Sequence, residues 1–259
     1  MFNLKGNVVI VTGGGSGIGK GMAKKFAQEG ANVVITGRTL EKLEEAKKEI
    51  ETFENQVLCL QMDVRDPEAV KKMVEDTKQA FGKIDHLVNN AAGNFICPSE
   101  DLSLNGWYSV VDIVLNGTWY CTQTVGKEWI ESRHQGSILN ISTTYAWMAS
   151  PGTVHSAAAK AGVLAMTRTL AVEWGKKYGI RLNAIAPGPI AETGAVEKLW
   201  PTEEQAEKVL NSIPSKRLGT TEEVANLAYF LLSPAAQYIN GECITIDGAQ
   251  WLNNSSFQL

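Results

Sequence analysis

The stretch Val8-Val9-Ile10-Val11-Thr12-Gly13-Gly14-Gly15-Ser16-Gly17-Ile18-Gly19 decides the fold of this 259-residue chain. A short β-branched run leads directly into a glycine-rich turn that opens a helix. The glycines permit a tight turn and let backbone N–H groups approach phosphate oxygens, while the helix N-terminus adds partial positive charge. A glycine-rich turn can be only a turn, but the strand–turn–helix context favours a dinucleotide site. Its predicted contacts are Gly13, Gly15, Ser16, Gly17, Ile18 and Gly19.

Short apolar runs alternate with amphipathic stretches along the rest of the chain. Continuous apolar runs are typical of strands buried on both faces of a parallel sheet. We therefore predict an α/β fold with a Rossmann-type doubly wound parallel sheet, flanked by helices, in a single domain over 1–259. Helices are expected over 40–53 and 68–81, and residues 188–213 are a candidate substrate lid. The predicted strands begin near Val8, Asn32, Gln56, Ile84, Ser137, Ile180 and Cys243.

The composition of the chain argues against several classes of function. The net charge of −4 and a pI of about 5.5 argue against a nucleic-acid-binding surface. The four cysteines form no C-x-x-C pair and the three histidines are dispersed, so we expect reduced thiols and no metal site. No apolar run is long enough to span a bilayer, and the first strand leaves no room for a signal peptide. We expect a soluble cytoplasmic protein that binds no membrane.

Three spaced motifs resemble the short-chain dehydrogenase/reductase family. They are Thr-Gly-x-x-x-Gly-x-Gly from Thr12, Asn89-Asn90-Ala91-Ala92-Gly93, and Pro187-Gly188-Pro189-Ile190. The likeness runs from about Leu4 to Gly248 and departs from the family at Ala249, where a second glycine is usual. The resemblance implies that the dinucleotide site also includes Asp63, which would contact the adenine, and Val64. The cofactor ribose would be lined by Asn89, Ala91 and Gly93. The nicotinamide would lie near Pro187, Gly188 and Ile190.

Arg38 follows the second predicted strand, where an NAD enzyme usually places an acidic residue. A guanidinium matches a 2′-phosphate in charge and in its forked donors. We therefore predict NADPH as the cofactor. The alternative is that Arg38 is simply a surface arginine.

The tyrosine expected four residues before the family lysine is absent. Ser156 precedes Lys160 at that spacing, and Tyr145 lies well upstream. Thr143 keeps a hydroxyl at the position of the family serine, and Asn116 resembles the family's helix asparagine. Hydride addition to a conjugated thioester occurs several bonds from the carbonyl, so the group that stabilises the oxygen must be displaced from the nicotinamide. A tyrosine at position 145 fits that requirement.

The segments around Tyr145, Lys160, Asn116 and Pro187 together resemble the NADPH-dependent 2,4-dienoyl-CoA reductases. The resemblance implies reduction of 2,4-dienoyl-CoA to 3-enoyl-CoA in unsaturated fatty-acid β-oxidation, by a homotetramer. Tyr145 and Asn116 are expected to hydrogen-bond the thioester oxygen, while Lys160 holds the ribose and Ser156 supports Lys160. Candidate groups for the CoA phosphates are Lys198, Lys216 and Arg217, and candidate acyl-groove aromatics are Phe95, Trp107, Trp147 and Trp200.

Two enzyme alternatives and one non-catalytic alternative stay open at this point. A carbonyl reductase would keep a tyrosine at position 156, and a related enoyl-thioester reductase would keep one at position 153, where Thr153 stands. Loss of the family tyrosine is also what a non-catalytic NADP-binding protein would show. The retained Asn116, Tyr145 and Lys160 argue for chemistry.

Overall fold

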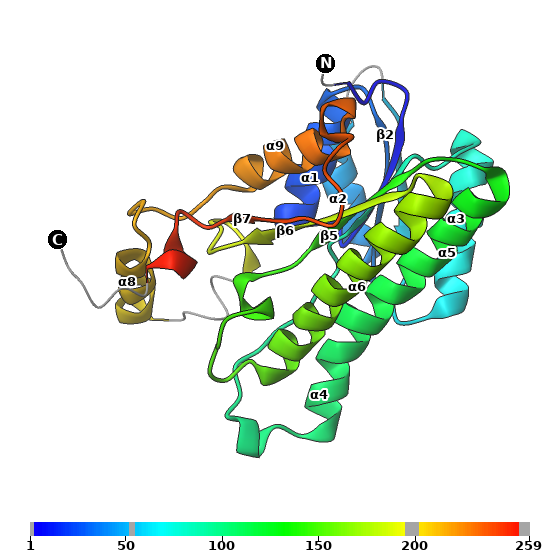
Figure 1. Ribbon diagram of the computed structural model, residues 1–259. Helices are drawn as coiled ribbons and strands as arrows, with labels where there is room; N and C mark the ends of the chain where they lie inside the picture. The colour runs from blue at the N-terminus through cyan, green and yellow to red at the C-terminus, as the bar shows by residue number, and fades with distance from the viewer. Residues whose placement is uncertain (1–2, 52–54, 195–201, 254–259) are drawn as a thin grey trace.

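The computed structural model describes residues 3–51, 55–194 and 202–253, and it contains one parallel sheet of seven strands (Figure 1). The strand order β3-β2-β1-β4-β5-β6-β7 places the two halves of a doubly wound sheet on either side of the β1–β4 pair. All seven predicted strands are present. They are β1 (Val8–Thr12), β2 (Asn32–Gly37), β3 (Val57–Gln61), β4 (His86–Asn89), β5 (Ser137–Ile141), β6 (Arg181–Pro187) and β7 (Cys243–Ile246).

Helices cover both faces of the sheet, as predicted. One face carries α1 (Gly17–Gln28), α2 (Leu40–Ile50) and α9 (Thr221–Leu232), which pack Phe26, Leu43 and Val224 onto the strands. The other face carries α3 (Pro67–Phe81), α5 (Gly117–Ser132) and α6 (Val154–Tyr178), which contribute Met73, Trp129 and other buried side chains. The Rossmann-type class is therefore confirmed. No helix among the described residues is long and apolar enough to cross a membrane.

The helix boundaries follow local capping chemistry. The Asp66 side chain accepts a hydrogen bond from the Glu68 N–H at 2.9 Å, and Pro67 occupies the first turn, so α3 begins where the sequence predicts. Helix α2 ends at Ile50, a few residues before the expected end at Phe53, which lies outside the described residues.

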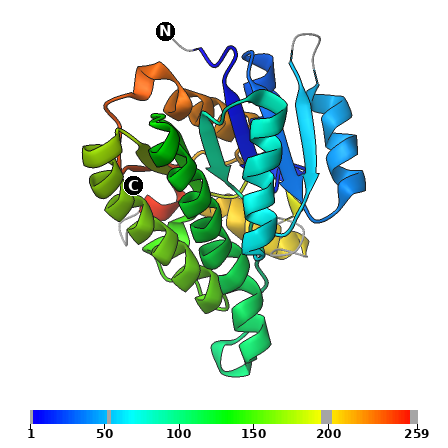
Figure 2. The ribbon, with the colours of Figure 1, turned by 90° about the vertical axis from the view of Figure 1, so that its right-hand side faces the viewer.

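A π-helical turn interrupts the long helical segment that precedes β5. The segment consists of α4 (Leu104–Val111), the π-helical turn η2 (Asp112–Asn116) and α5. Figure 2 shows α4 projecting past the carboxyl ends of the strands. π-Helical turns occur frequently at functional sites, and this one carries Asn116, a predicted catalytic residue, and Ile113.

The described part of the predicted lid contains helix α8 (Glu203–Ser212), which begins with a side-chain cap from Thr202. Residues 195–201 of that segment lie outside the described residues. Helix α8 lies beside the 3₁₀ turn η5 (Gln250–Leu252) near the C-terminus (Figure 1). Ala249, which replaces the usual family glycine, adopts a left-handed φ of 68° there.

A chain of buried polar side chains joins the central strands to the helices on one face. The Asn89 amide on β4 donates to Thr122 Oγ1 on α5 and to Asn140 Oδ1 on β5, both at 2.9 Å. The Asn140 amide in turn donates to Thr167 Oγ1 on α6 at 2.8 Å. Since Asn140 and Thr167 are fully buried, these bonds fix the relative position of four elements.

We expect Asn140→Ala to lower the free energy of unfolding by about 1–3 kcal/mol, because it leaves one N–H of the buried Asn89 amide without its acceptor and removes the donor to Thr167 Oγ1. Urea denaturation measures this loss. The matched control is Asn253→Ala, which removes a hydrogen-bonding asparagine from an exposed position. Equal stabilities of the two variants would contradict the role given to the chain of side chains.

Candidate active site

A cavity of about 860 Å³ opens where the carboxyl ends of the strands meet. This is the position at which open α/β sheets bind ligands, beside the strand pair where the chain order reverses. The glycine-rich turn, the end of β2, the segments after β4 and β5, and the start of α6 all contribute to its lining. The cavity is therefore the candidate active site.

The glycine-rich turn is shaped for close approach of a diphosphate. Gly13 has a φ of +66°, which favours glycine, and a Cβ on Gly19 would overlap the Gly13 carbonyl and the Asn90 amide. Ser16 is the N-cap of α1, yet its side chain makes no capping bond and it lines the cavity. The backbone donors at this helix N-terminus therefore face space that an anion can occupy.

A clamp between the ends of β1 and β4 holds this turn in place. Thr12 Oγ1 accepts hydrogen bonds from the backbone N–H groups of Asn90 and Ala91, each at 3.0 Å. The Asn90 amide donates to the carbonyls of Thr12 and Gly13, at 3.0 and 3.2 Å. The sequence motifs singled out both segments, but only the structure shows that they bind each other.

Arg38 and Asp63 lie at the end of the cavity formed by the carboxyl ends of β2 and β3. Arg38 is exposed and its side chain makes no hydrogen bond or ion pair within the described residues, so its guanidinium is available to a ligand. The Asp63 carboxylate pairs with Arg65, whose Nη2 lies 2.6 Å from Oδ2, and this hydrogen bond lowers the Asp63 pKa. The adenine contact predicted for Asp63 would have to share the carboxylate with Arg65.

Three of the four predicted catalytic residues meet at the other end of the cavity. Tyr145 lies in the 3₁₀ turn η3 (Thr144–Ala146) after β5, and Ser156 and Lys160 lie one turn apart on α6. The Lys160 ammonium is buried and donates to the Ile141 carbonyl at the end of β5. Burial without a carboxylate partner lowers the pKa of Lys160 to about 8.

Tyr145 is suited to donate a hydrogen bond rather than to lose its proton. Burial raises the pKa of its phenol above the usual value of 10, although a hydrogen bond with the Ser150 side chain opposes part of that rise. The side chain is therefore neutral at pH 7, and Tyr145 is one of the residues that line the cavity.

The fourth predicted catalytic residue, Asn116, does not line the cavity. Its amide donates to Asp112 Oδ1 at 2.8 Å, across the π-helical turn, and it is Ile113 of the same turn that reaches the lining. Asn89 is likewise absent from the lining because its amide is used inside the protein, on Thr122 and Asn140. The sequence motif identified the right segment here, but the neighbouring Asn90 is the residue that reaches the cavity.

All other predicted cofactor contacts line the cavity. They are Gly13, Gly15, Ser16, Gly17, Ile18, Gly19, Arg38, Asp63, Val64, Ala91, Gly93, Lys160, Pro187, Gly188 and Ile190. Thr193, Val209 and Ser212 line the cavity from within the predicted lid, whereas sequence reasoning missed Gln250 and Asn253 altogether. No motif marks them, because they converge only through the tertiary fold.

The described aromatic residues predicted for an acyl groove, and the described basic residues predicted to bind the CoA phosphates, do not line this cavity. Phe95 packs against His155, with ring centroids 4.5 Å apart, and Arg217 forms an ion pair with Glu223 at 2.6 Å. Neither they nor Trp107, Trp147 and Lys216 line the cavity. Lys198 and Trp200 lie outside the described residues.

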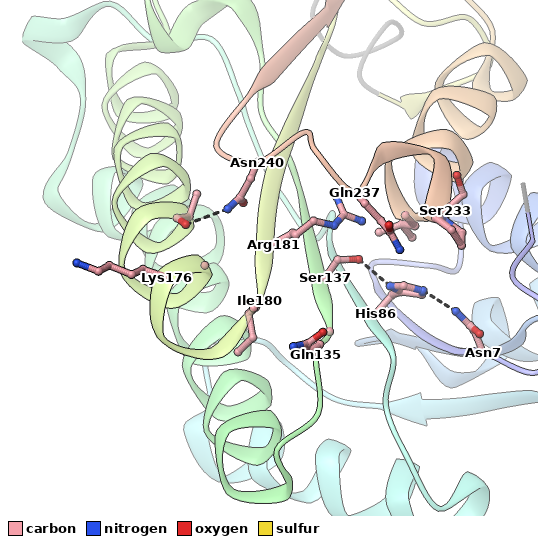
Figure 3. A pocket seen from close by; sticks show the side chains of 16 residues that line it. Asn7, His86, Gln135, Ser137, Lys176, Ile180, Arg181, Ser233, Gln237 and Asn240 are labelled. Carbon is pink, nitrogen blue, oxygen red and sulfur yellow. Dashed lines mark hydrogen bonds between the residues drawn. The ribbon is translucent and has the colours of Figure 1, made fainter. Parts of the chain in front are cut away.

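A second cavity of about 620 Å³ lies at the opposite edge of the sheet (Figure 3). His86 sits there between the Asn7 amide, at 2.8 Å from Nε2, and Ser137 Oγ, at 2.7 Å from Nδ1, and burial lowers the pKa of His86 to about 4. The Arg181 guanidinium donates to the carbonyls of Leu231, Ala236 and Ile239. These polar groups are used to hold the fold together, so we place the chemistry in the first cavity.

The fold and the site together define a dinucleotide-dependent oxidoreductase. A family model described as enoyl-(acyl carrier protein) reductase matches residues 13–249. The chain is 61% identical over 249 residues to a Bacillus subtilis protein named "probable 2,4-dienoyl-CoA reductase [(2E)-enoyl-CoA-producing]", covering 96% of this chain and 98% of that protein. The chain belongs to the short-chain dehydrogenase/reductase family.

Two further comparisons agree with this assignment. A Caenorhabditis elegans protein named "probable 2,4-dienoyl-CoA reductase 3 [(3E)-enoyl-CoA-producing]" is 46% identical over 251 residues, or 95% of this chain and 81% of that protein. The crystal structure of a Bacillus anthracis short-chain dehydrogenase superposes with a TM-score of 0.90 at 61% identity, covering 98% of this chain and 100% of that one.

The pKa of Lys160 predicts a pH dependence of dinucleotide binding. We expect NADPH affinity to be constant below about pH 8 and to fall above it, because Lys160 then loses the charge that attracts the cofactor. Fluorescence titration of NADPH between pH 6.5 and 9.5 measures this change. In Lys160→Arg, whose side chain stays protonated, the decline should disappear. An unchanged wild-type affinity across the range would contradict the assignment.

Proposed function

We propose that this protein reduces 2,4-dienoyl-CoA to 3-enoyl-CoA with NADPH. The observation that carries the proposal is the placement of Tyr145 in the active-site cavity while Ser156 occupies the usual tyrosine position beside Lys160. A phenol displaced from the lysine suits a substrate whose carbonyl oxygen lies several bonds from the carbon that is reduced. The names of the relatives support the same substrate class.

The residues of the cavity fit a bound dinucleotide, which supplies hydride when it is present. The glycine-rich turn has space and donors for the diphosphate, and the Lys160 ammonium is placed to hold the ribose hydroxyls of the nicotinamide half. Ser156, one turn before Lys160, supports the orientation of the lysine. These contacts would fix the reactive end of the cofactor in the cavity, where the δ-carbon of the substrate has to approach it.

Tyr145 then stabilises the negative charge that develops on the thioester oxygen. Its neutral O–H donates to that oxygen from a buried position, where a hydrogen bond to a developing charge is strengthened. Asn116 is proposed as a second donor. Its amide nitrogen keeps one N–H after the bond to Asp112, and Ile113 of the same π-helical turn lines the cavity.

The final proton is proposed to come from water at the α-carbon. Asp63 is the one carboxylate among the described residues that line the cavity, and it lies at the adenine end, paired with Arg65. Protonation at the α-carbon gives a 3-enoyl-CoA, whereas protonation at the γ-carbon gives a 2-enoyl-CoA. The names of the Bacillus subtilis and Caenorhabditis elegans relatives differ on this product.

The direct test is NADPH oxidation with a short 2,4-dienoyl-CoA beside matched 2-enoyl-CoA and 3-oxoacyl-CoA. We expect turnover of the diene alone, and mass and NMR analysis of the product should show the double bond at carbon 3. Turnover of the 3-oxo compound instead would favour a carbonyl reductase. Tight NADPH binding with no turnover would favour a non-catalytic binding protein.

We expect Tyr145→Phe to lower kcat by roughly 10²- to 10³-fold, because one preorganised donor to the developing oxyanion is removed. NADPH affinity should be unchanged, because the phenol is not assigned to the cofactor. Steady-state kinetics and NADPH titration measure the two effects. The matched control is Tyr178→Phe, which lies at the far end of α6. An unchanged kcat in Tyr145→Phe would remove this residue from the mechanism.

Arg38 supports NADPH over NADH in this proposal, because its unpaired guanidinium lines the cavity next to β2. We expect Arg38→Ala to reduce kcat/KM for NADPH by about 10- to 100-fold, which is the value of charge-assisted hydrogen bonds to a phosphate. The value for NADH should hardly change. Equal kcat/KM values for the two cofactors in the wild type would identify Arg38 as an ordinary surface arginine.

The remaining proposals concern the oligomeric state, the cellular location and the domain organisation of the protein. We infer a homotetramer, because exposed apolar side chains such as Leu104, Val172 and Tyr238 are available for subunit contacts. Cytoplasmic location, the single-domain organisation over 1–259 and the substrate lid near 188–213 stay predictions from the sequence. The place of α8 in the lining of the cavity supports the lid.

A further inference from the structure

The outer side of the active-site cavity is built from α8 and from η5, two segments that no motif connects. Val209 and Ser212 of α8 and Gln250 and Asn253 at η5 line the cavity. The Gln250 amide donates to Ser212 Oγ, and the Asn253 amide donates to the Ser212 carbonyl, both at 2.9 Å. Because Ser212 binds both side chains, the two segments form one unit, which we call the outer wall.

An aromatic contact joins the outer wall to the loop that carries Tyr145. The ring centroids of Trp147 and Trp251 are 5.9 Å apart and the rings are nearly perpendicular, at 83°, which is a favoured edge-to-face arrangement. Trp147 follows Tyr145 by two residues, and the next residues, Met148 and Ala149, line the cavity themselves. The pair therefore couples the outer wall to the proposed oxyanion donor.

The turn before Trp251 is held in the conformation that presents this ring. The Asp247 carboxylate accepts hydrogen bonds from the backbone N–H groups of Ala249 and Trp251, at 3.0 and 2.8 Å. Ala249 keeps a left-handed φ, which residues other than glycine rarely adopt. Because Ala249 adopts this backbone conformation without being a glycine, contacts around the turn must stabilise it. The Trp147–Trp251 pair is one of these contacts.

The outer wall also has groups that match the amide-rich arm of an acyl thioester. After donating to Ser212, the Gln250 and Asn253 side chains each keep a carbonyl oxygen with no hydrogen-bond donor in the described part of the chain. Such oxygens can accept the amide N–H groups of a pantetheine arm. The contacts proposed for the diphosphate and adenine end of the dinucleotide lie at the glycine-rich turn and at the ends of β2 and β3, and Figure 1 shows α1 and β2 apart from α8.

Resting on the proposed function, we propose that Trp147 and Trp251 are positioning residues that latch the outer wall against the pantetheine arm of the acyl thioester. Binding of the thioester depends on the latch, and binding of the dinucleotide does not. The latch acts through Gln250, Asn253 and the Tyr145 loop, without a contact of its own to the reacting atoms.

The experiment compares Trp251→Ala and Trp251→Phe with the wild type, using a 2,4-dienoyl-CoA and NADPH. We expect KM for the thioester to rise roughly three- to tenfold in Trp251→Ala, which corresponds to the loss of one edge-to-face pair. Trp251→Phe should recover most of the affinity, because it keeps an aromatic ring. The Kd of NADPH should be unchanged in both. Tyr178→Ala, which removes an exposed aromatic side chain at the far end of α6, is the matched control.

An unchanged KM in Trp251→Ala, or an equal loss of NADPH affinity, would overturn the latch. If the wild type does not turn over the diene, the proposed function fails separately, and the latch is then judged by equilibrium binding. Calorimetric titration with the same dienoyl-CoA should still show weaker binding to Trp251→Ala than to the wild type. Equal Kd values, or no detectable binding to the wild type, would overturn the proposal.

Discussion

The clamp between Thr12 and Asn90 is the constraint on which the site depends. One hydroxyl receives two backbone N–H groups, and one amide returns two hydrogen bonds to the glycine-rich turn. The clamp joins the segments that follow β1 and β4, the pair of strands at which the chain order of the sheet reverses. It therefore fixes the diphosphate-binding turn relative to β5, whose end carries Tyr145 and supplies the carbonyl that receives Lys160.

The electrostatics of the reaction end follow from this rigid frame. Lys160 is buried with a carbonyl partner rather than a carboxylate, so its charge is poised near neutral pH and is available to a ligand. Tyr145 is buried nearby and stays protonated. Burial therefore lowers the pKa of the lysine and raises that of the tyrosine, which suits the cofactor-holding and hydrogen-bond-donating roles proposed for them.

The sequence predicted the sheet and most of the site because both depend on local patterns. Apolar runs located all seven strands, and the glycine turn and Pro187–Ile190 line the cavity as their motifs indicate. Asn89 and Asn116 do not line the cavity, because their amides are hydrogen-bonded to Thr122, Asn140 and Asp112, which their motifs do not indicate. The α8 part of the outer wall lies in the predicted lid, but its union with η5 could not be predicted, since the two parts are 38 residues or more apart in the chain and meet through tertiary contacts.

The π-helical turn over Asp112–Asn116 has a consequence for how this protein can change. Such a turn accommodates one more residue than an α-helical turn, so removal of a single residue would restore a continuous α-helix. Because the wider turn takes up its extra residue locally, α4 and α5 would keep nearly the same faces toward the rest of the protein. The residues of the turn itself would shift, among them Ile113, which lines the cavity. A one-residue deletion there is therefore a route to a changed cavity lining on an unchanged sheet.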